Sequence, residues 1–344
     1  MRVVVVGATG NVGTSVVAAL AADPAVSSVL GLARREPEWR PAKVEWRQAD
    51  IGKDDLRQHF AGAGAVVNLA WLFQPTRDAV VTWRNNVLGG IRVFRAVADA
   101  GVPVLVHASS VGTYSPGPKD RRVGEDWPTH GWPRAAYARE KAYLERVLDA
   151  YEREHPDIRV VRMRPSFVFK RESAVEQRRL FAGPFLPNRV ARLARPELVP
   201  FVPDTPGLVF QAVHGDDIGE AYRLAVTKDV SGPFNIAADP VIEPATLAAL
   251  LGARLVKVPG PLLTGMVAAA WRLHLVPASP GLVDLVLRLP LMDAGRARDE
   301  LGWRPRHTAL DALRDFAAGL RDPRGMDTPP LSPRPEEAKA SAAP

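Results

Sequence analysis

The sequence predicts an α/β protein: a doubly wound parallel sheet followed by a smaller, mostly helical cap. Two observations support this fold class. Short apolar runs alternate with segments of helical periodicity through the first half of the chain, and almost every position within those runs is apolar. Strands that are apolar on both faces are typical of a parallel sheet covered by helices on both sides.

The predicted strands are short runs rich in valine, leucine and alanine. They cover residues 3–6, 28–32, 44–47, 65–69, 103–107, 158–162 and 233–236. Helical periodicity is predicted between them, over residues 12–22, 54–60, 78–100, 134–154 and 216–227. Right-handed strand–helix–strand crossovers then place helices on both faces of the sheet.

The regular alternation stops after Pro165, where prolines and arginines become frequent. We therefore predict a first domain made of residues 1–165 and about 209–237. A cap that binds the substrate is predicted over residues 166–208 and 238–321. Residues 322–344 are rich in Pro, Ser, Glu, Lys and Ala, so we expect a disordered tail from Asp322.

Composition and charge exclude several kinds of protein. There is no cysteine, so disulfides and cysteine-based catalysis or metal ligation are excluded, and we predict no metal site. The apolar stretch 262–276 is too short to span a bilayer and the first residues do not resemble a secretory signal, so we expect a soluble, cytoplasmic protein. The net charge of +7 comes with arginine pairs but no nucleic-acid-binding motif. We therefore expect a solvated basic surface and small anionic ligands rather than nucleic acid.

A glycine-rich turn connects the first predicted strand to the first helix. This strand–turn–helix context is the one that a dinucleotide site requires, although the spacing is G-x-x-G-x-x-G rather than G-x-G-x-x-G. The first glycine permits a tight turn, the second lets a pyrophosphate approach and the third lets helix and strand pack closely. The helix N-terminus offers free amides to the phosphates. We therefore predict a Rossmann domain whose cofactor contacts include Gly7, Thr9, Gly10, Asn11, Val12 and Gly13.

The end of the second strand indicates which dinucleotide is bound. An acidic residue there would hydrogen-bond the ribose 2′-hydroxyl of NAD, whereas this chain has Arg34 and Arg35. Guanidinium groups suit a 2′-phosphate, so NADP is favoured, with NAD as the alternative. Asp50 and Ile51 close the third strand, where a carboxylate can reach the adenine amino group. Equally, Asp50 can cap the next helix.

A tyrosine and a lysine suited to proton transfer stand four residues apart on a predicted helix. Tyr137 and Lys141 share a helical face, and a cation near a phenol is expected to lower the pKa of the tyrosine. Such a tyrosine exchanges a proton with a substrate oxygen while a nicotinamide exchanges hydride. Ser110, just after the fifth strand, lies where ligands bind in open α/β sheets.

Together these motifs resemble the extended short-chain dehydrogenase/reductases, in the NAD-dependent epimerase/dehydratase group. The resemblance covers about residues 1–320 and extends to Asn68-Leu69-Ala70, Asn86-Val87-Leu88-Gly89, Arg164-Pro165, His214-Gly215-Asp216-Asp217-Ile218, Phe234-Asn235-Ile236 and Leu301-Gly302-Trp303-Arg304-Pro305.

The resemblance implies a role for each member of a catalytic set. Tyr137 is the acid/base, Lys141 binds the nicotinamide ribose and lowers the tyrosine pKa, and Ser110 orients the substrate oxygen, with Ser109 as the alternative. It also adds Leu69, Ala70, Asn86 and Pro165 to the cofactor site.

The leading hypothesis is an NAD(P)-dependent oxidoreductase that interconverts a carbonyl and a secondary alcohol. Val111 and Gly112 replace the acidic pair of the family's dehydratases, and the arginine pair departs from its NAD-dependent epimerases. A sugar-nucleotide epimerase with retained NAD and a non-catalytic dinucleotide sensor or scaffold are the alternatives.

Two features of the cap bear on the substrate. The arginines of 171–195 suit a nucleotide sugar, or form a solvated basic loop. The apolar segments 262–276 and 281–289 suit a hydrophobic carbonyl compound, or form the core of the cap. The resemblance also makes a homodimer through helices 78–100 and 134–154 an expectation.

Overall fold

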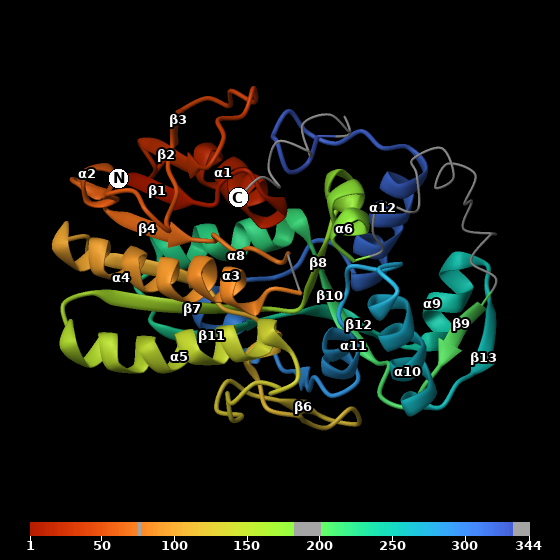
Figure 1. Cartoon of the computed structure of the whole chain (residues 1–344). Helices are drawn as coiled ribbons and strands as arrows, with labels where there is room; N and C mark the ends of the chain where they lie inside the picture. The colour runs from red at the N-terminus through yellow and green to blue at the C-terminus, as the bar shows by residue number, and fades with distance from the viewer. Residues whose placement is uncertain (75–76, 182–200, 333–344) are drawn as a thin grey trace.

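The computed structural model describes residues 1–74, 77–181 and 201–332 (Figure 1). Its main sheet has seven parallel strands in the order β11-β7-β5-β4-β1-β2-β3, which confirms the predicted doubly wound fold. The strands are β1 (Arg2–Val6), β2 (Ser28–Ala33), β3 (Val44–Gln48), β4 (Ala65–Asn68), β5 (Val104–Ala108), β7 (Arg159–Pro165) and β11 (Gly232–Ile236).

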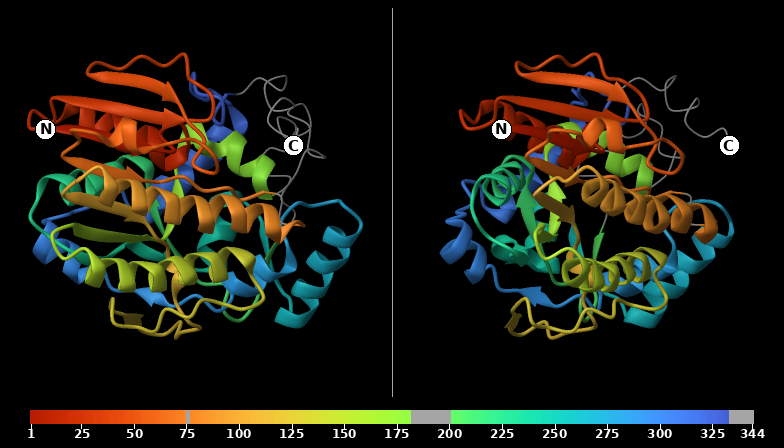
Figure 2. Two further views of the ribbon diagram at one scale, coloured as in Figure 1. Left: turned by 60° about the vertical axis from the view of Figure 1, so that its left-hand side comes forward. Right: turned by 90° about the vertical axis from the view of Figure 1, so that its left-hand side faces the viewer.

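Helices cover both faces of this sheet. Helices α1 (Asn11–Ala22) and α8 (Gly215–Thr227) pack together on one face, and α4 (Gly89–Asp99) and α5 (Ala136–Glu154) lie on the other (Figure 2). The predicted helix 78–100 is α3 (Ala79–Trp83), a π-helical turn η1 (Arg84–Leu88) and α4 in direct succession. The predicted helix 54–60 is shorter than expected, because only α2 (Arg57–Phe60) is helical.

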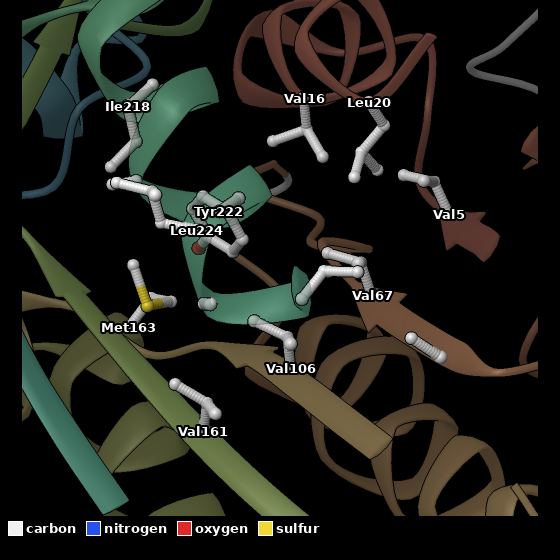
Figure 3. Packing of buried hydrophobic residues seen from close by; sticks show 14 of the residues in the cluster. Val5, Val16, Leu20, Val67, Val106, Val161, Met163, Ile218, Tyr222 and Leu224 are labelled. Carbon is white, nitrogen blue, oxygen red and sulfur yellow. The ribbon is translucent and has the colours of Figure 1, made fainter. Parts of the chain in front are cut away.

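Alternation along each strand explains why the strands are apolar throughout. In β1, Val3 and Val5 face α1 and α8, where Leu20 and Tyr222 are completely buried (Figure 3). Val4 and Val6 face the opposite core around Phe94 of α4 and Leu144 of α5. Full burial of each such side chain contributes about 1.5–3 kcal/mol. Both faces of the strand therefore need apolar residues.

The strand order reverses between β1 and β4, and this reversal positions the site. The connections that follow β1 and β4 run to opposite faces of the sheet, which opens a crevice beyond the carboxyl ends of these strands. Gly7 ends β1 there, and Leu69 and Ala70 follow β4. The predicted glycine turn therefore lies at the position where this fold class binds ligands.

The smaller part of the molecule contains more strand than the sequence predicts. Its strands are β8 (Phe167–Phe169), β10 (Phe210–His214) and β12 (Ala238–Ile242) in one sheet, β9 (Phe201–Asp204) with β13 (Arg254–Lys257), and β14 (Leu291–Met292) with β6 (Arg122–Val123). Its helices are α6 (Ala174–Phe181), α9 (Pro244–Leu251), α10 (Gly260–Arg272), α11 (Pro280–Val286) and α12 (Ala309–Arg321). Short helical turns are η2 (Val111–Thr113), η3 (Arg171–Ser173) and η5 (Ala297–Leu301). The boundaries proposed at residues 165, 209 and 237 stay predictions.

The expected disordered tail is wrong for residues 322–332. Leu331 is completely buried, and the carbonyl of Asp327 accepts hydrogen bonds from the amides of Glu38 and Trp39. The cause is that this polar segment packs against the first domain, which its composition does not reveal. The rest of the predicted tail, 333–344, lies outside the described residues. No helix within the described ranges is long and apolar enough to cross a membrane.

Candidate active site

The glycine turn is shaped by close backbone contacts. Gly7 has a φ of +79°, and its amide and that of Ala8 both donate to the carbonyl of Leu32. A Cβ on Gly13 would lie 2.3 Å from the Gly7 oxygen, so the protein itself requires glycine at 13. Among the described residues, a Cβ on Gly10 would meet nothing closer than 3.8 Å. The open side of Gly10 is therefore available to a ligand.

The start of α1 suits an anion. Gly10 is the N-cap residue and provides no side-chain cap, so the first-turn amides are left for a phosphate. Asn11 donates through Nδ2 to the carbonyl of Val168 at 3.1 Å, which ties α1 to β8. Within the described ranges its buried Oδ1 has no hydrogen-bond partner. Thr9 is buried, and Val12 packs against the core behind the turn.

Arg34 and Arg35 follow β2 directly, beside the glycine turn. The amides of Gly7 and Ala8 donate to the carbonyl of Leu32, which holds the end of β2 against the turn. The two arginines therefore lie near the start of α1. Arg34 is exposed and Arg35 is partly exposed. This placement is compatible with a 2′-phosphate, and the preference for NADP stays a prediction.

Asp50 and Ile51 lie at the neighbouring strand end. The Oδ1 of Asp50 accepts a hydrogen bond from the Gly52 amide at 2.8 Å, so one carboxylate oxygen stabilises a turn. The side chain of Ile51 packs on the start of α4, where a Cβ on Gly89 would lie 2.8 Å from it. The predicted adenine contact stays a prediction.

Asn86 holds the segment that follows Leu69 and Ala70. Its Oδ1 accepts from the Leu72 amide at 2.7 Å, and its Nδ2 donates to the Leu72 carbonyl at 2.9 Å and to Glu140 at 2.7 Å. Glu140 also accepts from Thr82 at 2.6 Å, and burial raises its pKa. The sequence indicated Asn86 but not Glu140 or Thr82, because a buried carboxylate on a helix has no local signature.

The structure brings Ser110, Tyr137 and Lys141 together beyond β5. Ser110 is the N-cap of η2 and hydrogen-bonds with Tyr137. The ammonium of Lys141 donates to the carbonyl of Ala108 at 2.6 Å. Ser109, the alternative serine, instead donates to Glu145 at 2.5 Å. Ser110 is therefore the serine that faces the tyrosine.

Aromatic side chains that the sequence analysis did not identify enclose Tyr137. Phe73 stacks on its ring, with centroids 5.2 Å apart, and Trp71 packs edge-on at 5.4 Å. The Lys141 ammonium lies 3.6 Å from the centre of the Trp71 ring, and Phe181 of α6 packs against Phe73. The surroundings of the tyrosine are apolar as a result.

The expected lowering of the tyrosine pKa is wrong for this structure. Burial raises the pKa of Tyr137 to about 12, and the hydrogen bond with Ser110 offsets this only in part. Burial also lowers the pKa of Lys141 to about 7. The physical reason is that the Lys141 ammonium lies against Ala108 and Trp71, in a site where burial disfavours both charged forms.

A buried ionic cluster supports the site from below. Glu145 on α5 accepts hydrogen bonds from two arginines of β7. One comes from Arg162, and Arg164 bonds to both of its oxygens. Burial alone would raise the pKa of Glu145, but the bonds and charges of the arginines lower it to about 2. Arg162 and Arg164 also line a hollow of about 390 Å³, whose lining does not include Ser110 or Tyr137. The cluster fixes α5, which carries Tyr137 and Lys141, to the sheet.

The His214 motif lies at the start of α8. His214 Nδ1 accepts from the Asp216 amide and its Nε2 hydrogen-bonds with Asp315. Its ring packs against the His307 ring at a tilt of 33°, with centroids 4.1 Å apart. His307 hydrogen-bonds in turn with Asp217 at 3.1 Å. These contacts join α8 to α12 and to the segment after Trp303.

Comparison with known proteins extends this description. The model of the NAD dependent epimerase/dehydratase family matches residues 3–237. An uncharacterized protein of Mycobacterium tuberculosis (strain ATCC 25618 / H37Rv) is 26% identical over 329 residues, covering 95% of this chain. The chain spans only 31% of that relative's length.

Two further proteins have named activities. The 4-hydroxy-2-methyl-3-oxo-4-farnesyl-3,4-dihydroquinoline-1-oxide ketoreductase of Stigmatella aurantiaca is 28% identical over 173 residues, which cover 49% of this chain and 51% of that protein. The solved structure of Thermus thermophilus UDP-glucose 4-epimerase in complex with NAD superimposes with a TM-score of 0.69. It is 22% identical, over 94% of this chain and 99% of that one. At this level of identity the superposition supports the fold alone.

Proposed function

Because the chain belongs to the NAD-dependent epimerase/dehydratase family, we propose that it is an NAD(P)-dependent oxidoreductase that interconverts a carbonyl and a secondary alcohol. The observation that carries the proposal is the grouping of Ser110, Tyr137 and Lys141 at the carboxyl end of β5. A hydroxyl pair beside a lysine is suited to moving a proton to or from a substrate oxygen.

The residues at the crevice fit a dinucleotide. The open side of Gly10 and the uncapped start of α1 suit the pyrophosphate, and Arg34 and Arg35 suit a 2′-phosphate. Asp50 and Ile51 would flank the adenine, and Leu69, Ala70, Asn86 and Pro165 would line the nicotinamide half. When bound, the cofactor supplies the hydride acceptor or donor.

The protein's own residues handle the proton. A tyrosine whose pKa is about 12 is protonated at neutral pH, so Tyr137 acts as the acid that donates to the carbonyl oxygen during reduction. Ser110 hydrogen-bonds the same oxygen and orients it. Lys141 binds the nicotinamide ribose, and its charged form stabilises the tyrosinate left behind.

The surroundings of Tyr137 favour an apolar carbonyl substrate over a sugar. Trp71, Phe73 and Phe181 offer ring faces, whereas the hydroxyls of a sugar need polar partners. Two arginines proposed for a nucleotide sugar are engaged elsewhere: Arg171 with Asp322 at 2.7 Å and Arg179 with the Ser332 carbonyl at 3.1 Å. The remaining part of that stretch, 182–195, lies outside the described residues. The ketoreductase of Stigmatella aurantiaca is named for a farnesylated substrate, which supports the same choice.

A sugar-nucleotide epimerase is the second candidate, because the family whose model matches the chain is that of the NAD dependent epimerases and dehydratases. The two candidates differ in how they hold the cofactor, because an epimerase returns the hydride to its own substrate and retains NAD. Denaturing the purified protein and identifying the released nucleotide separates them. Stoichiometric NAD favours the epimerase, an empty protein that takes up NADPH favours the reductase, and a protein that binds neither contradicts both.

The proton step is tested with a matched pair of tyrosines on α5. Tyr137→Phe is expected to lower the rate of NADPH-dependent reduction of prenylated or aromatic ketones by at least about a hundredfold. It should leave NADPH affinity unchanged. Tyr143→Phe, at an exposed position six residues further on, is the control and should retain full activity. An unchanged rate in Tyr137→Phe would remove this tyrosine from the mechanism.

A further inference from the structure

Helix α10 carries an apolar stripe that no other described element covers. None of its residues is buried, although its sequence is almost entirely apolar. Leu262, Met266 and Leu273 are 55%, 45% and 70% exposed, and with Ala269 they recur at helical spacing along one side. Leu275, just after the helix, is 52% exposed. A helix that is apolar all round normally lies in a core, so this one indicates a partner.

The stripe lies in a part of the chain that carries only positive charge. Between Glu243 and Asp284 the sequence has no carboxylate, while it contains Arg254, Lys257 and Arg272. Arg254, Lys257 and Arg272 are all exposed, as are Leu255 and Val256 on the same short strand, β13. The carboxylate opposite Lys257 in the strand register is Asp204 of β9. Exposed leucines beside arginines that form no ion pair within the described ranges are typical of segments that bind the surface of a membrane.

We infer that α10 and its flanking cations form a docking surface for an anionic lipid bilayer. The helix lies at the end of the molecule remote from the N-terminus, together with α9, β9 and β13 (Figure 1). Charge favours a bilayer over a second copy of this chain, because the segment between Glu243 and Asp284 offers no carboxylate to the arginines of another copy of the same segment. Anionic lipid headgroups complement the cations, and acyl chains accept the leucines.

This surface is joined to the region of the candidate active site. The guanidinium of Arg77 lies 4.3 Å above the ring of Trp271 on α10 and donates to the Trp271 carbonyl. Arg77 follows shortly after Trp71 and Phe73, which enclose Tyr137. The inference does not rest on the proposed reaction, because lipid binding is measured without turnover.

The test is co-sedimentation of the full-length protein with vesicles. Vesicles of phosphatidylcholine containing phosphatidylglycerol are expected to bind it at least about tenfold more tightly than pure phosphatidylcholine, with binding that weakens as salt rises. The double variant Leu262→Glu/Leu273→Glu should lose at least about tenfold in affinity. Arg254→Gln/Arg272→Gln should lose the preference for phosphatidylglycerol.

The matched control is Leu88→Glu, which places the same charge at a residue that is 48% exposed in η1, outside this surface. It should bind vesicles as the wild type does. Unchanged circular dichroism and thermal midpoint show that each variant is folded. The inference is overturned if the wild type binds neither vesicle, or binds both equally. A dimer that dissociates in the Leu262→Glu/Leu273→Glu variant would overturn it in favour of self-association.

Discussion

At Tyr137, burial raises the pKa of the phenol and a hydrogen bond lowers it. The aromatic rings of Trp71 and Phe73 pack against the tyrosine, and burial disfavours the phenolate, while the hydrogen bond with Ser110 favours it. Burial prevails, so the resting site holds a neutral phenol beside a lysine whose charged form is also disfavoured. A neutral phenol is the form that the proposed reduction requires, because it would donate the proton to the carbonyl oxygen.

The lowered pKa of Lys141 predicts a pH dependence of stability. The folded protein releases this proton near pH 7, whereas the unfolded chain keeps it until about pH 10. Between these values the unfolded chain binds the extra proton, so this lysine makes the free energy of unfolding rise with pH, by up to about 1.4 kcal/mol per unit. Lys141→Met should lack that contribution.

Urea unfolding of the wild type and Lys141→Met across this pH range measures the difference directly. Lys119 and Lys170, whose pKa values burial lowers to about 8, contribute equally to both proteins and cancel. Parallel curves for the two proteins would show that Lys141 keeps an ordinary pKa in the fold.

The arginines after β2 predict a dinucleotide preference. The wild type is expected to bind NADPH about tenfold more tightly than NADH, and Arg34→Ala/Arg35→Ala should reduce that ratio to near one by weakening NADPH binding alone. Fluorescence titration measures both affinities. Arg40→Ala, at an exposed arginine further along the same connection, is the control. Equal loss of NADH and NADPH binding would contradict a 2′-phosphate contact.

At the scale of elements, α1 and α5 each combine a face that packs in the core with a face that carries candidate site residues. In α5, Tyr137, Lys141 and Glu145 follow one another at intervals of four residues, so one side of the helix carries the candidate acid, the lysine and the buried anchor to Arg164. In α1, the first turn faces the crevice while Val16 and Leu20 pack against α8. Cofactor binding and core packing can therefore be separated by mutation.

Substitutions at two glycines of the turn should separate cofactor binding from core packing. Gly13→Ala places a methyl 2.3 Å from the Gly7 oxygen, so it should lower the free energy of unfolding by more than about 2 kcal/mol. Gly10→Ala meets no protein atom closer than 3.8 Å, so it should fold normally yet lose at least about tenfold in NADPH affinity. Urea denaturation and nucleotide titration distinguish the two. Full cofactor affinity in Gly10→Ala would show that the pyrophosphate does not approach there.

At the scale of the whole molecule, distant segments close the structure. Residues 322–332 return to the first domain, where Asp327 bonds to Glu38 and Trp39, and the carbonyl of Ser332 accepts from Arg179 of α6. The ion pair of Arg171 with Asp322 adds a further link. The smaller part of the molecule and the nucleotide-binding part are thus held together by a segment expected to contribute nothing.

A substitution at Leu331 tests whether residues 322–332 pack against the rest of the protein. Leu331→Ala should lower the free energy of unfolding by about 2–5 kcal/mol, because the side chain is completely buried. Arg324→Ala, whose side chain is 70% exposed, is the control and should change it by less than about 0.5 kcal/mol. Both are measured by thermal and urea unfolding. Equal stability of the two variants would mean that residues 322–332 do not pack in solution.

The sequence by itself determined the features whose signals are local. Apolar runs located the sheet strands to within a few residues, glycine spacing located the turn before α1, and the interval of four between Tyr137 and Lys141 placed both on one helical face. Each of these features depends on backbone geometry that residues close in the sequence impose. Predicting it therefore requires no knowledge of long-range contacts.

Only the tertiary structure decided the features that depend on residues distant in the chain. The hydrogen bond that turns Ser109 toward Glu145 depends on another element, and the burial that raises the pKa of Tyr137 involves Trp71 and Phe73 in the segment after β4. The packing of Leu331 likewise needs a surface built by other segments. Burial is a property of the assembled fold, and it sets both the protonation of the site and the order of residues 322–332.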